Sequence, residues 1–298
     1  MLSEVFKLFW KTVEMKDARR INSQTPPTEI EQFCDIQYID DGLWQHRLDV
    51  YSKSGKLSHR PVIIDIHGGG WMYGTKEINK NYCLVLAQND YVVVNINYRL
   101  APDFSVADQL RDCFFAFKWV STNIEKYGGD LNDVFVTGDS AGGFLAAYSA
   151  LLNSSDKLRK VFGVTESGLE FRACGLTSPV CFMNTHTFQD VYYSRVKGKE
   201  FSESTLRGFE NFDAVLNKGS MPPTFLVTSS GDAVGRLPTI KIYNLLCGEG
   251  VKCKLCLLYT SPSPRDVFSV IDPFSVPGKE TISDMLGFFS DYAKSRCK

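Results

Sequence analysis

The sequence predicts an α/β fold with a mostly parallel, twisted sheet flanked by helices. From residue 61 onward, short continuous apolar runs alternate with stretches of helical periodicity. Strands that are buried on both faces in a parallel sheet produce such runs. The 298 residues include 44% hydrophobic and 22% charged positions, which is typical of a globular protein with a core. We therefore expect one domain over residues 1–298.

The first elements precede this alternation. Between residues 2 and 13, apolar side chains recur at helical spacing, and the polar stretch 23–27 interrupts the pattern. This predicts a helix that covers an apolar surface. Two strand-like runs follow at 35–39 and 46–51, joined by a turn at Asp40-Asp41-Gly42, and they predict an antiparallel pair.

The alternation then assigns the remaining elements. Strands are expected at 61–66, 91–96, 134–137, 171–176, 225–228 and 251–258, and helices at 76–89, 106–127, 141–152, 237–248 and 279–294. The aromatic stretch 181–218 interrupts the pattern as an insertion. Together with residues 1–33 it is expected to form a small helical cap. Its aromatic side chains, Tyr192, Phe201 and Phe209 among them, are interpreted as packing residues and not as site residues.

Charge and apolar pattern limit the partners. Lysine and arginine total 33 and acidic residues 34, so the formal charge of −1 provides no basic field for nucleic acid. No apolar run approaches the roughly 18 residues of a membrane span, and residues 1–10 do not resemble a signal peptide. The nine cysteines, mostly beside apolar residues, predict reduced, buried thiols. We expect a cytoplasmic protein with no nucleic-acid or membrane partner; its oligomeric state is left open.

The segment Gly138-Asp139-Ser140-Ala141-Gly142 fits a nucleophile elbow. An apolar strand precedes it and a helix rich in small residues follows it, which is the context this motif requires. Glycines at 138 and 142 allow the sharp turn, and the helix N-terminus after Ser140 favours developing negative charge. The backbone amide of Ala141 is expected to donate to an oxyanion. The alternative is a glycine-rich loop with a capping serine.

A second glycine-rich segment, His67-Gly68-Gly69-Gly70-Trp71, follows the strand at 61–66. Loops of this type turn backbone amides toward a substrate oxyanion. A simple turn or a phosphate cradle would also be glycine-rich, but the phosphate-binding fingerprints are absent from the sequence. We interpret the segment as an oxyanion loop in which His67 is structural and not a catalytic base.

Together, the motifs at 67–71, 97–102 (Asn-Tyr-Arg-Leu-Ala-Pro) and 138–143 resemble the hormone-sensitive-lipase family of α/β-hydrolases, over about residues 45–246. The resemblance implies a carboxylesterase for short acyl chains, with a cap formed partly by the N-terminal segment. It implies Ser140 as nucleophile and Gly69, Gly70 and Ala141 as oxyanion donors. Asp139 is then expected to organise the backbone and Arg99 to form a structural ion pair. The motif residues assigned structural roles are His67, Gly68, Trp71, Gly138, Asp139 and Gly142.

The resemblance also assigns the acid. In the family it follows the strand after the cap, which here matches residues 225–232 and identifies Asp232. Such a carboxylate holds the catalytic imidazole in the required tautomer and stabilises its charged form. Asp232 could instead be an ordinary turn residue. Asp213 is a weaker candidate, because it lies in the insertion.

The base is missing. The triad order requires a histidine after the acid, yet the histidines are at 46, 59, 67 and 186, all before Asp232. The family's His-x-Phe segment is matched here by Asp266-Val267-Phe268. A serine without a base is a weak nucleophile at neutral pH, and an aspartate is too acidic to replace it. The chain as printed is therefore expected to be catalytically impaired.

The string from Cys256 to Asp266 suggests a reason. It resembles the translated end of a transposon adapter used to prepare sequencing libraries. One hypothesis is that the printed chain is chimeric and that the natural protein carries a histidine here. The rival hypothesis is a real loss of the base, which leaves a small-ligand-binding protein, as in the similar plant gibberellin receptors. Cys253 and Cys256 form a C-x-x-C pair that is too weak a signal for a metal site.

The expected function is hydrolysis of a small, uncharged, short-acyl ester through Ser140, Asp232 and the base position 266. This chemistry needs no metal and no organic cofactor. An arylformamidase is the alternative enzyme, because it resembles this family in its oxyanion loop and triad. Hydrolysis of N-formylkynurenine compared with p-nitrophenyl acetate separates the two activities.

Overall fold

Eight strands form one sheet through the centre of the molecule. The computed structural model describes residues 2–55, 59–183, 189–203, 206–259 and 267–294. The strands are β1 (Ile30–Gln37), β2 (Arg47–Lys53), β3 (Arg60–Ile66), β4 (Val92–Ile96), β5 (Gly129–Asp139), β6 (Phe171–Thr177), β7 (Thr224–Ser229) and β8 (Cys253–Leu258). Their order is β1-β2-β4-β3-β5-β6-β7-β8. Pairings from β4 to β8 are parallel, and β2 is antiparallel to both neighbours. The predicted mostly parallel sheet is confirmed.

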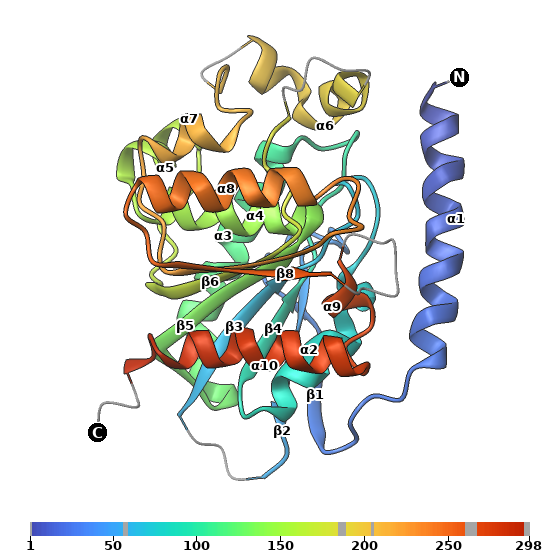
Figure 1. Cartoon of the computed structure of the whole chain (residues 1–298), viewed down its shortest axis with the longest axis vertical. Coiled ribbons are helices and arrows are strands. Elements are labelled where there is room, and N and C mark those ends of the chain that lie inside the picture. The colour runs from blue at the N-terminus through green and yellow to red at the C-terminus, as the bar shows by residue number, and fades with distance from the viewer. Residues whose placement is uncertain (1, 56–58, 184–188, 204–205, 260–266, 295–298) are drawn as a thin grey trace.

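Helices cover both faces of this sheet (Figure 1). They are α1 (Leu2–Ser23), η1 (Lys76–Asn79), α2 (Lys80–Gln88), α3 (Val106–Asn123), η2 (Ile124–Tyr127), α4 (Ser140–Asn153), α5 (Asp156–Phe162), α6 (Gln189–Glu203), α7 (Phe212–Leu216), α8 (Arg236–Gly248), α9 (Phe268–Ile271) and α10 (Val276–Ser290). One apolar cluster lies under α3, α4 and α8, and the other lies under α2 and α10. The central strands contribute to both clusters, which explains their continuously apolar sequences.

Several expected boundaries were wrong. The first strand begins at Ile30 and not at Asp35, so residues 30–33 belong to the sheet and not to the cap segment. β1 is an edge strand whose residues are mostly exposed, and its sequence therefore lacks the apolar alternation that reveals a half-buried strand. The helix expected at 76–89 begins with a turn of 3₁₀ helix. Helices α5 and α9 were not predicted, because segments of this length carry little periodicity.

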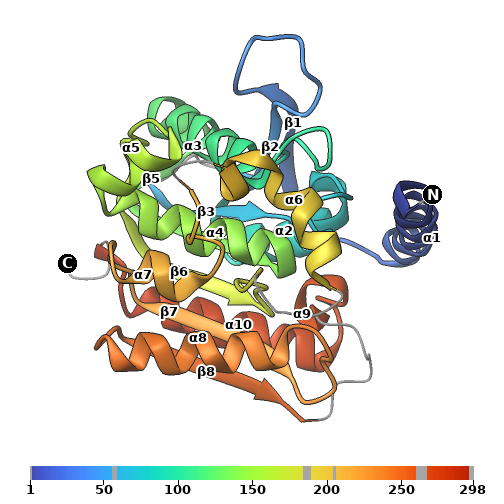
Figure 2. The same ribbon diagram turned by 90° about the horizontal axis from the view of Figure 1, so that it is seen from above.

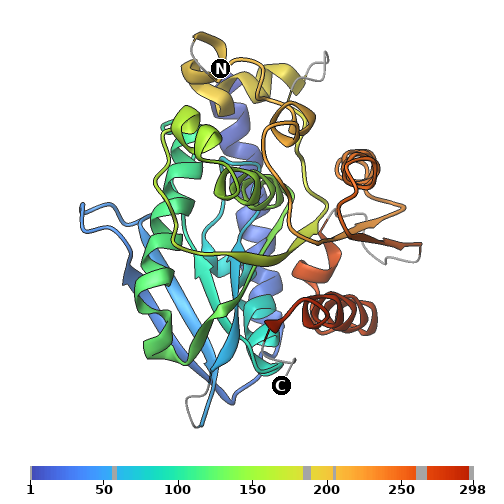
Figure 3. The same cartoon turned by 90° about the vertical axis from the view of Figure 1, so that its left-hand side faces the viewer.

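Two segments lie outside the sheet and its covering helices. Between β6 and β7, helices α6 and α7 gather at one end of the molecule, while α1 runs along its side (Figures 1 and 3). From above, α1 stands apart from the layers, on the side of α2 and α9 (Figure 2). A backbone bridge between Phe182 and Asn211 closes the base of the α6–α7 excursion. These segments lie within the two ranges, 1–33 and 181–218, in which a helical cap was expected, but residues 30–33 belong to β1.

The prediction of buried thiols was wrong for half of the described cysteines. Cys83, Cys113, Cys174 and Cys181 are buried, whereas Cys34 and Cys247 are exposed and Cys253 and Cys256 are partly exposed. The last three belong to α8 and the edge strand β8, where one side of each element lacks a covering neighbour. Among the described residues, no helix is both long enough and apolar enough to cross a membrane.

Candidate active site

Ser140 lies at the turn between β5 and α4 with a strained backbone. Its φ of 51° lies in the left-handed region, which costs energy for a residue with a side chain. The turn is tight because Gly142 passes close to the backbone: a Cβ at this position would collide with the carbonyl oxygens of Ile66 and His67. Ser140 itself is partly exposed at the start of α4. The fold therefore presents this hydroxyl at the carboxyl end of the central strand, as the elbow motif requires.

The glycine loop after β3 lies beside this serine. Gly69 and Gly70 line the same pocket as Ser140. Both have positive φ, 115° and 59°, which glycine adopts without strain. The Gly68 amide donates to Asp139 Oδ1 at 3.0 Å and so is already engaged. Ala141 is the second residue of α4, where helical amides have no partner within the helix. Gly69, Gly70 and Ala141, the expected oxyanion donors, thus lie close to Ser140.

His67 holds the glycine loop in place through ring stacking and hydrogen bonds. It is fully buried, stacks on Tyr98 with ring centroids 4.4 Å apart, and pairs its Nδ1 with the Gly68 carbonyl at 2.7 Å. Tyr98 in turn donates to the His67 carbonyl at 2.8 Å. Burial lowers the pKa of His67 to about 4, so its ring is neutral at physiological pH. These contacts fit a structural role for His67.

The segments beside the loop make structural contacts of their own. The buried Trp71 packs its ring on Phe144, and its carbonyl accepts from the Ala101 amide and from Gln109. Arg99 forms an ion pair with the buried Asp112, donating from both Nε and Nη2. Both arrangements match the structural roles expected from the motif.

A buried acidic network lies under the nucleophile. Asn79 Nδ2 donates to Asp139 Oδ1 at 2.8 Å and to Asp65 Oδ2 at 2.9 Å. Burial raises the pKa of Asp139 to about 7, and nearby Asp65 adds to the shift, while Asn79 and Arg20 oppose it. Burial also raises the pKa of Asp65 to about 6. Asp139 therefore organises the glycine loop as expected, and it changes protonation near neutral pH.

Asp232 follows β7 and is buried with a full set of hydrogen bonds. The amides of Val234 and Gly235 donate to Oδ1 at 3.0 and 2.6 Å, and the hydroxyls of Ser178 and Thr228 donate to Oδ2 at 2.5 and 3.1 Å. These four donors fill the acceptor sites of a carboxylate.

The segment after β6 connects the acid to the nucleophile. Ser178 bonds Asp232, and two residues later the Val180 amide donates to the Ser140 carbonyl at 3.2 Å. Ser140 and Asp232 thus lie at the same end of the sheet. They follow β5 and β7, the two strands that flank β6. Asp213, the weaker candidate, lies on α7 within the cap.

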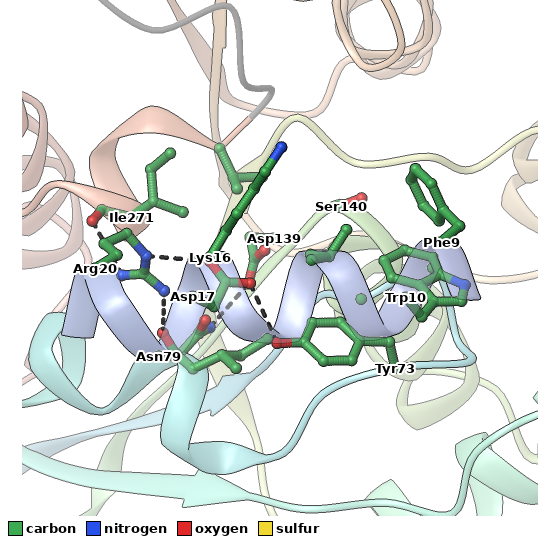
Figure 4. A pocket seen from close by; sticks show the side chains of 15 residues that line it. Phe9, Trp10, Lys16, Asp17, Arg20, Tyr73, Asn79, Asp139, Ser140 and Ile271 are labelled. Atoms are coloured by element: carbon green, nitrogen blue, oxygen red, sulfur yellow. Dashed lines mark hydrogen bonds and ion pairs between the residues drawn. The ribbon is translucent and has the colours of Figure 1, made fainter. Parts of the chain in front are cut away.

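The N-terminal helix forms one wall of the pocket at Ser140 (Figure 4). Phe9, Trp10 and Val13 supply apolar surface, and Trp10 stacks on Tyr73 at 5.3 Å. Arg20 anchors the helix: it donates to the carbonyls of Ile78 and Ile271 and pairs with the buried Asp17 at 3.2 Å. The periodicity of residues 2–13 predicted this helix, and the family resemblance implied that the N-terminal segment forms part of a cap. The structure places the helix against the pocket at Ser140.

The second cap segment reaches the oxyanion loop through Tyr192. Its hydroxyl donates to the Gly70 carbonyl at 2.5 Å. A Cβ at Gly70 would lie 2.5 Å from this hydroxyl and from the Trp10 ring, so both cap segments crowd one point of the loop. Tyr192 packs against the apolar core as predicted, and the hydrogen bond from its hydroxyl is an additional contact that the sequence did not predict. The contact joins residues 122 positions apart, and no local pattern marks it.

Asp266, the residue at the expected base position, lies outside the described residues. Val267, the next residue, lines the pocket with Ser140. His46 is buried between Asp41 and Asp112 at 2.7 and 3.2 Å, and this ion-paired site raises its pKa despite burial. His46 and His67 are therefore engaged elsewhere. In the described ranges, no three histidine, cysteine or acidic side chains gather where a metal ion could be held.

Known proteins are similar to this chain in sequence and in architecture. The profile of the BD-FAE family matches residues 48–193. The isoprenylcysteine alpha-carbonyl methylesterase ICME of Arabidopsis thaliana is 28% identical over 80% of this chain and 58% of its own. Carboxylesterase NlhH of Mycobacterium tuberculosis is 32% identical over 47% of this chain and 45% of its own. This chain thus spans about half the length of these two relatives.

A solved structure covers nearly the whole chain. Esterase B from Lactobacillus rhamnosis, inhibited by a tributyrin phosphonate, superposes with a TM-score of 0.92 at 29% identity, covering 99% of this chain and 96% of its own. The metagenomic carboxylesterase EstE1, at 22% identity and a TM-score of 0.73, shares the fold. The similarity to esterase B includes both cap segments, since so little of either chain is left unmatched.

Proposed function

We propose that the chain is a carboxylesterase-like α/β-hydrolase of the hormone-sensitive-lipase family, and that it hydrolyses small, short-acyl carboxylic esters with Ser140 as nucleophile. The observation that carries this proposal is the strained turn at Ser140 beside Gly69 and Gly70 in one pocket. The esterase names of the relatives, and the phosphonate-inhibited esterase B, support the same reaction class.

Each residue of the proposed site has its own role in ester hydrolysis. Ser140 Oγ attacks the ester carbonyl, and the amides of Gly69, Gly70 and Ala141 stabilise the oxyanion that forms. Each such donor contributes about 3 to 4 kcal/mol in the transition state. Trp10 and Tyr192 limit the space above Gly70, and this crowding supports the short-acyl preference. Phe9 and Val13 give the pocket an apolar wall, which supports an uncharged substrate.

A histidine at position 266 would complete the triad. Its Nδ1 would donate to Asp232, whose oxygens already accept four hydrogen bonds. One hydroxyl must therefore turn away. Ser178 is suited to this, because its Oγ lies 3.3 Å from the alternative acceptor Thr228 Oγ1. Without a base at 266, the Ser140 hydroxyl keeps its proton at neutral pH, and hydrolysis of the ester is slow.

The test is a gain of function. The Asp266→His variant is expected to hydrolyse p-nitrophenyl acetate at least about 10³-fold faster than the printed chain, because a positioned general base contributes about 10²- to 10⁴-fold. The matched control, Asp266→His combined with Ser140→Ala, is expected to lose this gain. An Asp266→His variant that is no faster than its Ser140→Ala control would contradict the proposal.

A second candidate is a ligand-binding protein on the same fold. It is favoured by Asp266 in the sequence and by the filled acceptor sites of Asp232. This candidate gains support if Asp266→His stays inactive while the printed chain binds a small ester, measured by calorimetry. The arylformamidase alternative is tested in the same assay, by replacing p-nitrophenyl acetate with N-formylkynurenine.

The codons themselves decide whether the printed chain is chimeric. Amplification of the coding region from source DNA, read without a transposon-based library, covers residues 250–270. A histidine codon before Val267 would place the base in the natural sequence at the position of Asp266. Codons that encode Pro262, Pro264 and Asp266 as printed would exclude the adapter hypothesis and favour the binding protein.

A further inference from the structure

Cys247 and Cys253 meet at the end of the molecule away from the pocket. Their sulfur atoms lie 3.2 Å apart, and both thiols are free in the structure. Cys247 is in the last turn of α8 and is exposed; Cys253 is the first residue of the edge strand β8 and is partly exposed. Neither residue lines the Ser140 pocket, and both precede the adapter-like string that begins at Cys256.

The backbone holds the two cysteines in this position. Gly250, with a φ of 72°, turns the chain after α8, and its amide donates to the Cys247 carbonyl at 3.1 Å. The Val251 amide donates to the Leu246 carbonyl at 3.0 Å, which closes the helix end. On the strand side, Cys253 pairs with Thr224 of β7. The sulfurs therefore face each other because both ends of a short connection are fixed.

We propose that Cys247 and Cys253 form a redox-active dithiol that low-molecular-weight disulfides oxidise to an internal disulfide. A disulfide needs a sulfur–sulfur distance of about 2.05 Å, so the pair must close by roughly 1 Å, which side-chain rotation can supply. The exposure of Cys247 gives the oxidant access, and the adjacent Cys253 resolves the intermediate. The site is independent of the chemistry at Ser140.

The reaction balances in two exchanges. The thiolate of Cys247 attacks a small disulfide such as oxidised glutathione, forms a mixed disulfide and releases one small thiolate. Cys253 Sγ, as it loses its proton, then attacks Cys247 Sγ and releases the second small thiolate. The protein dithiol loses two electrons, the small disulfide gains them, and the two cysteine protons end on the released thiols. Burial raises the pKa of Cys253 to about 12 and Cys247 adds to the shift, which is consistent with Cys253 acting second.

The nearby Cys256 is not the partner. Side chains alternate between the faces of a strand, so Cys253 and Cys256 point to opposite sides of β8. Cys253 packs on the apolar cluster under α8, and Cys256 packs on the cluster under α10. The C-x-x-C spacing of the sequence therefore does not form a local pair. Cys34, the other fully exposed thiol among the described residues, lies on β1 at the opposite edge of the sheet.

The experiment oxidises the folded, full-length chain. The protein is reduced, freed of reductant, incubated with oxidised glutathione at pH 8 and quenched with N-ethylmaleimide. Intact mass spectrometry should find the loss of two hydrogens, and trypsin should release peptide 242–252 linked to the dipeptide 253–254. The melting temperature is expected to rise by about 3 °C, a modest gain because the closed loop is short.

Variants separate the pair from other thiols. Cys253→Ser should leave a stable glutathione adduct on Cys247, whereas the matched controls Cys34→Ser and Cys256→Ser should still form the 247–253 bridge. Stable adducts on both Cys247 and Cys253 without a bridge would overturn the proposal. So would a bridge to Cys256, or two thiols that remain fully alkylated.

Discussion

The nucleophile side and the base side of the pocket are built in contrasting ways. Ser140, Gly69 and Gly70 lie on adjacent strand ends, β5 and β3, and a buried network through Asp139 ties the two turns together. On the other side, Asp232 is held by four donors, but position 266 belongs to a string with no catalytic histidine. The residues proposed for the nucleophile side are all present, whereas those proposed for the base side end at Asp232.

This difference shows which part of the proposed site can be lost while the fold is kept. The strained φ of Ser140 needs its surroundings to maintain it, and those surroundings are intact in this chain. The proposed base depends on one side chain at position 266, beyond the edge strand β8, so exchanging the residues there can remove the base without changing the core strands. A fold can therefore keep a well-formed nucleophile turn while the sequence lacks the group that activates it.

The largest expected effect tests the acid. In the Asp266→His background, Asp232→Asn should lower kcat for p-nitrophenyl acetate by about 10³-fold, to near the level of the printed chain, because an amide favours the wrong histidine tautomer. Asp213→Asn, the matched control on α7, should leave kcat within about twofold. The opposite pattern, in which Asp213→Asn causes the large loss, would reassign the acid to the cap.

The next effect concerns the buried network on the nucleophile side. Burial raises the folded-state pKa of Asp139 to about 7, above its value in an unfolded chain, so the folded protein binds the extra proton. The free energy of unfolding should therefore fall as the pH rises from about 4 to about 7 and then level off. Asp139→Asn should be more stable than the parent at pH 8 by about 2 kcal/mol and should keep only the smaller decline due to Asp65.

Thermal melts between pH 4 and pH 8 measure this effect. The amide oxygen of asparagine can still accept from Gly68 and Asn79, so the loop should stay in place. Asp103→Asn, an exposed substitution, is the control and should follow the parent at every pH. A stability difference between the parent and Asp139→Asn that stays constant across this window would mean that Asp139 is ionised throughout.

The smallest effect tests the contact between cap and oxyanion loop. In the Asp266→His background, Tyr192→Phe removes the hydrogen bond to the Gly70 carbonyl and should lower kcat about fivefold, with KM little changed, since a neutral hydrogen bond contributes about 1 kcal/mol. Tyr193→Phe is the matched control, because Tyr193 packs on Trp71 with its ring. A change in KM alone would assign Tyr192 to substrate binding instead.

Local patterns predicted what depends on neighbours in the chain. The continuous apolar runs gave the central strands, because burial on both faces requires them, and the glycine motifs gave the two turns beside Ser140. Edge elements were predicted poorly. β1 is exposed along most of its length, and the thiols near β8 are not buried as their sequence neighbours suggested, since burial at a sheet edge depends on what packs there.

The sequence by itself determined the parallel sheet, the strained nucleophile turn and the missing histidine, because each is written in adjacent residues. Only the tertiary structure decided that α1 walls the pocket, that Tyr192 bonds the oxyanion loop and that Cys247 meets Cys253. These contacts depend on how helices outside the sheet dock and on where a turn brings two ends together. Docking is set by the summed packing of distant surfaces, and no local periodicity encodes it.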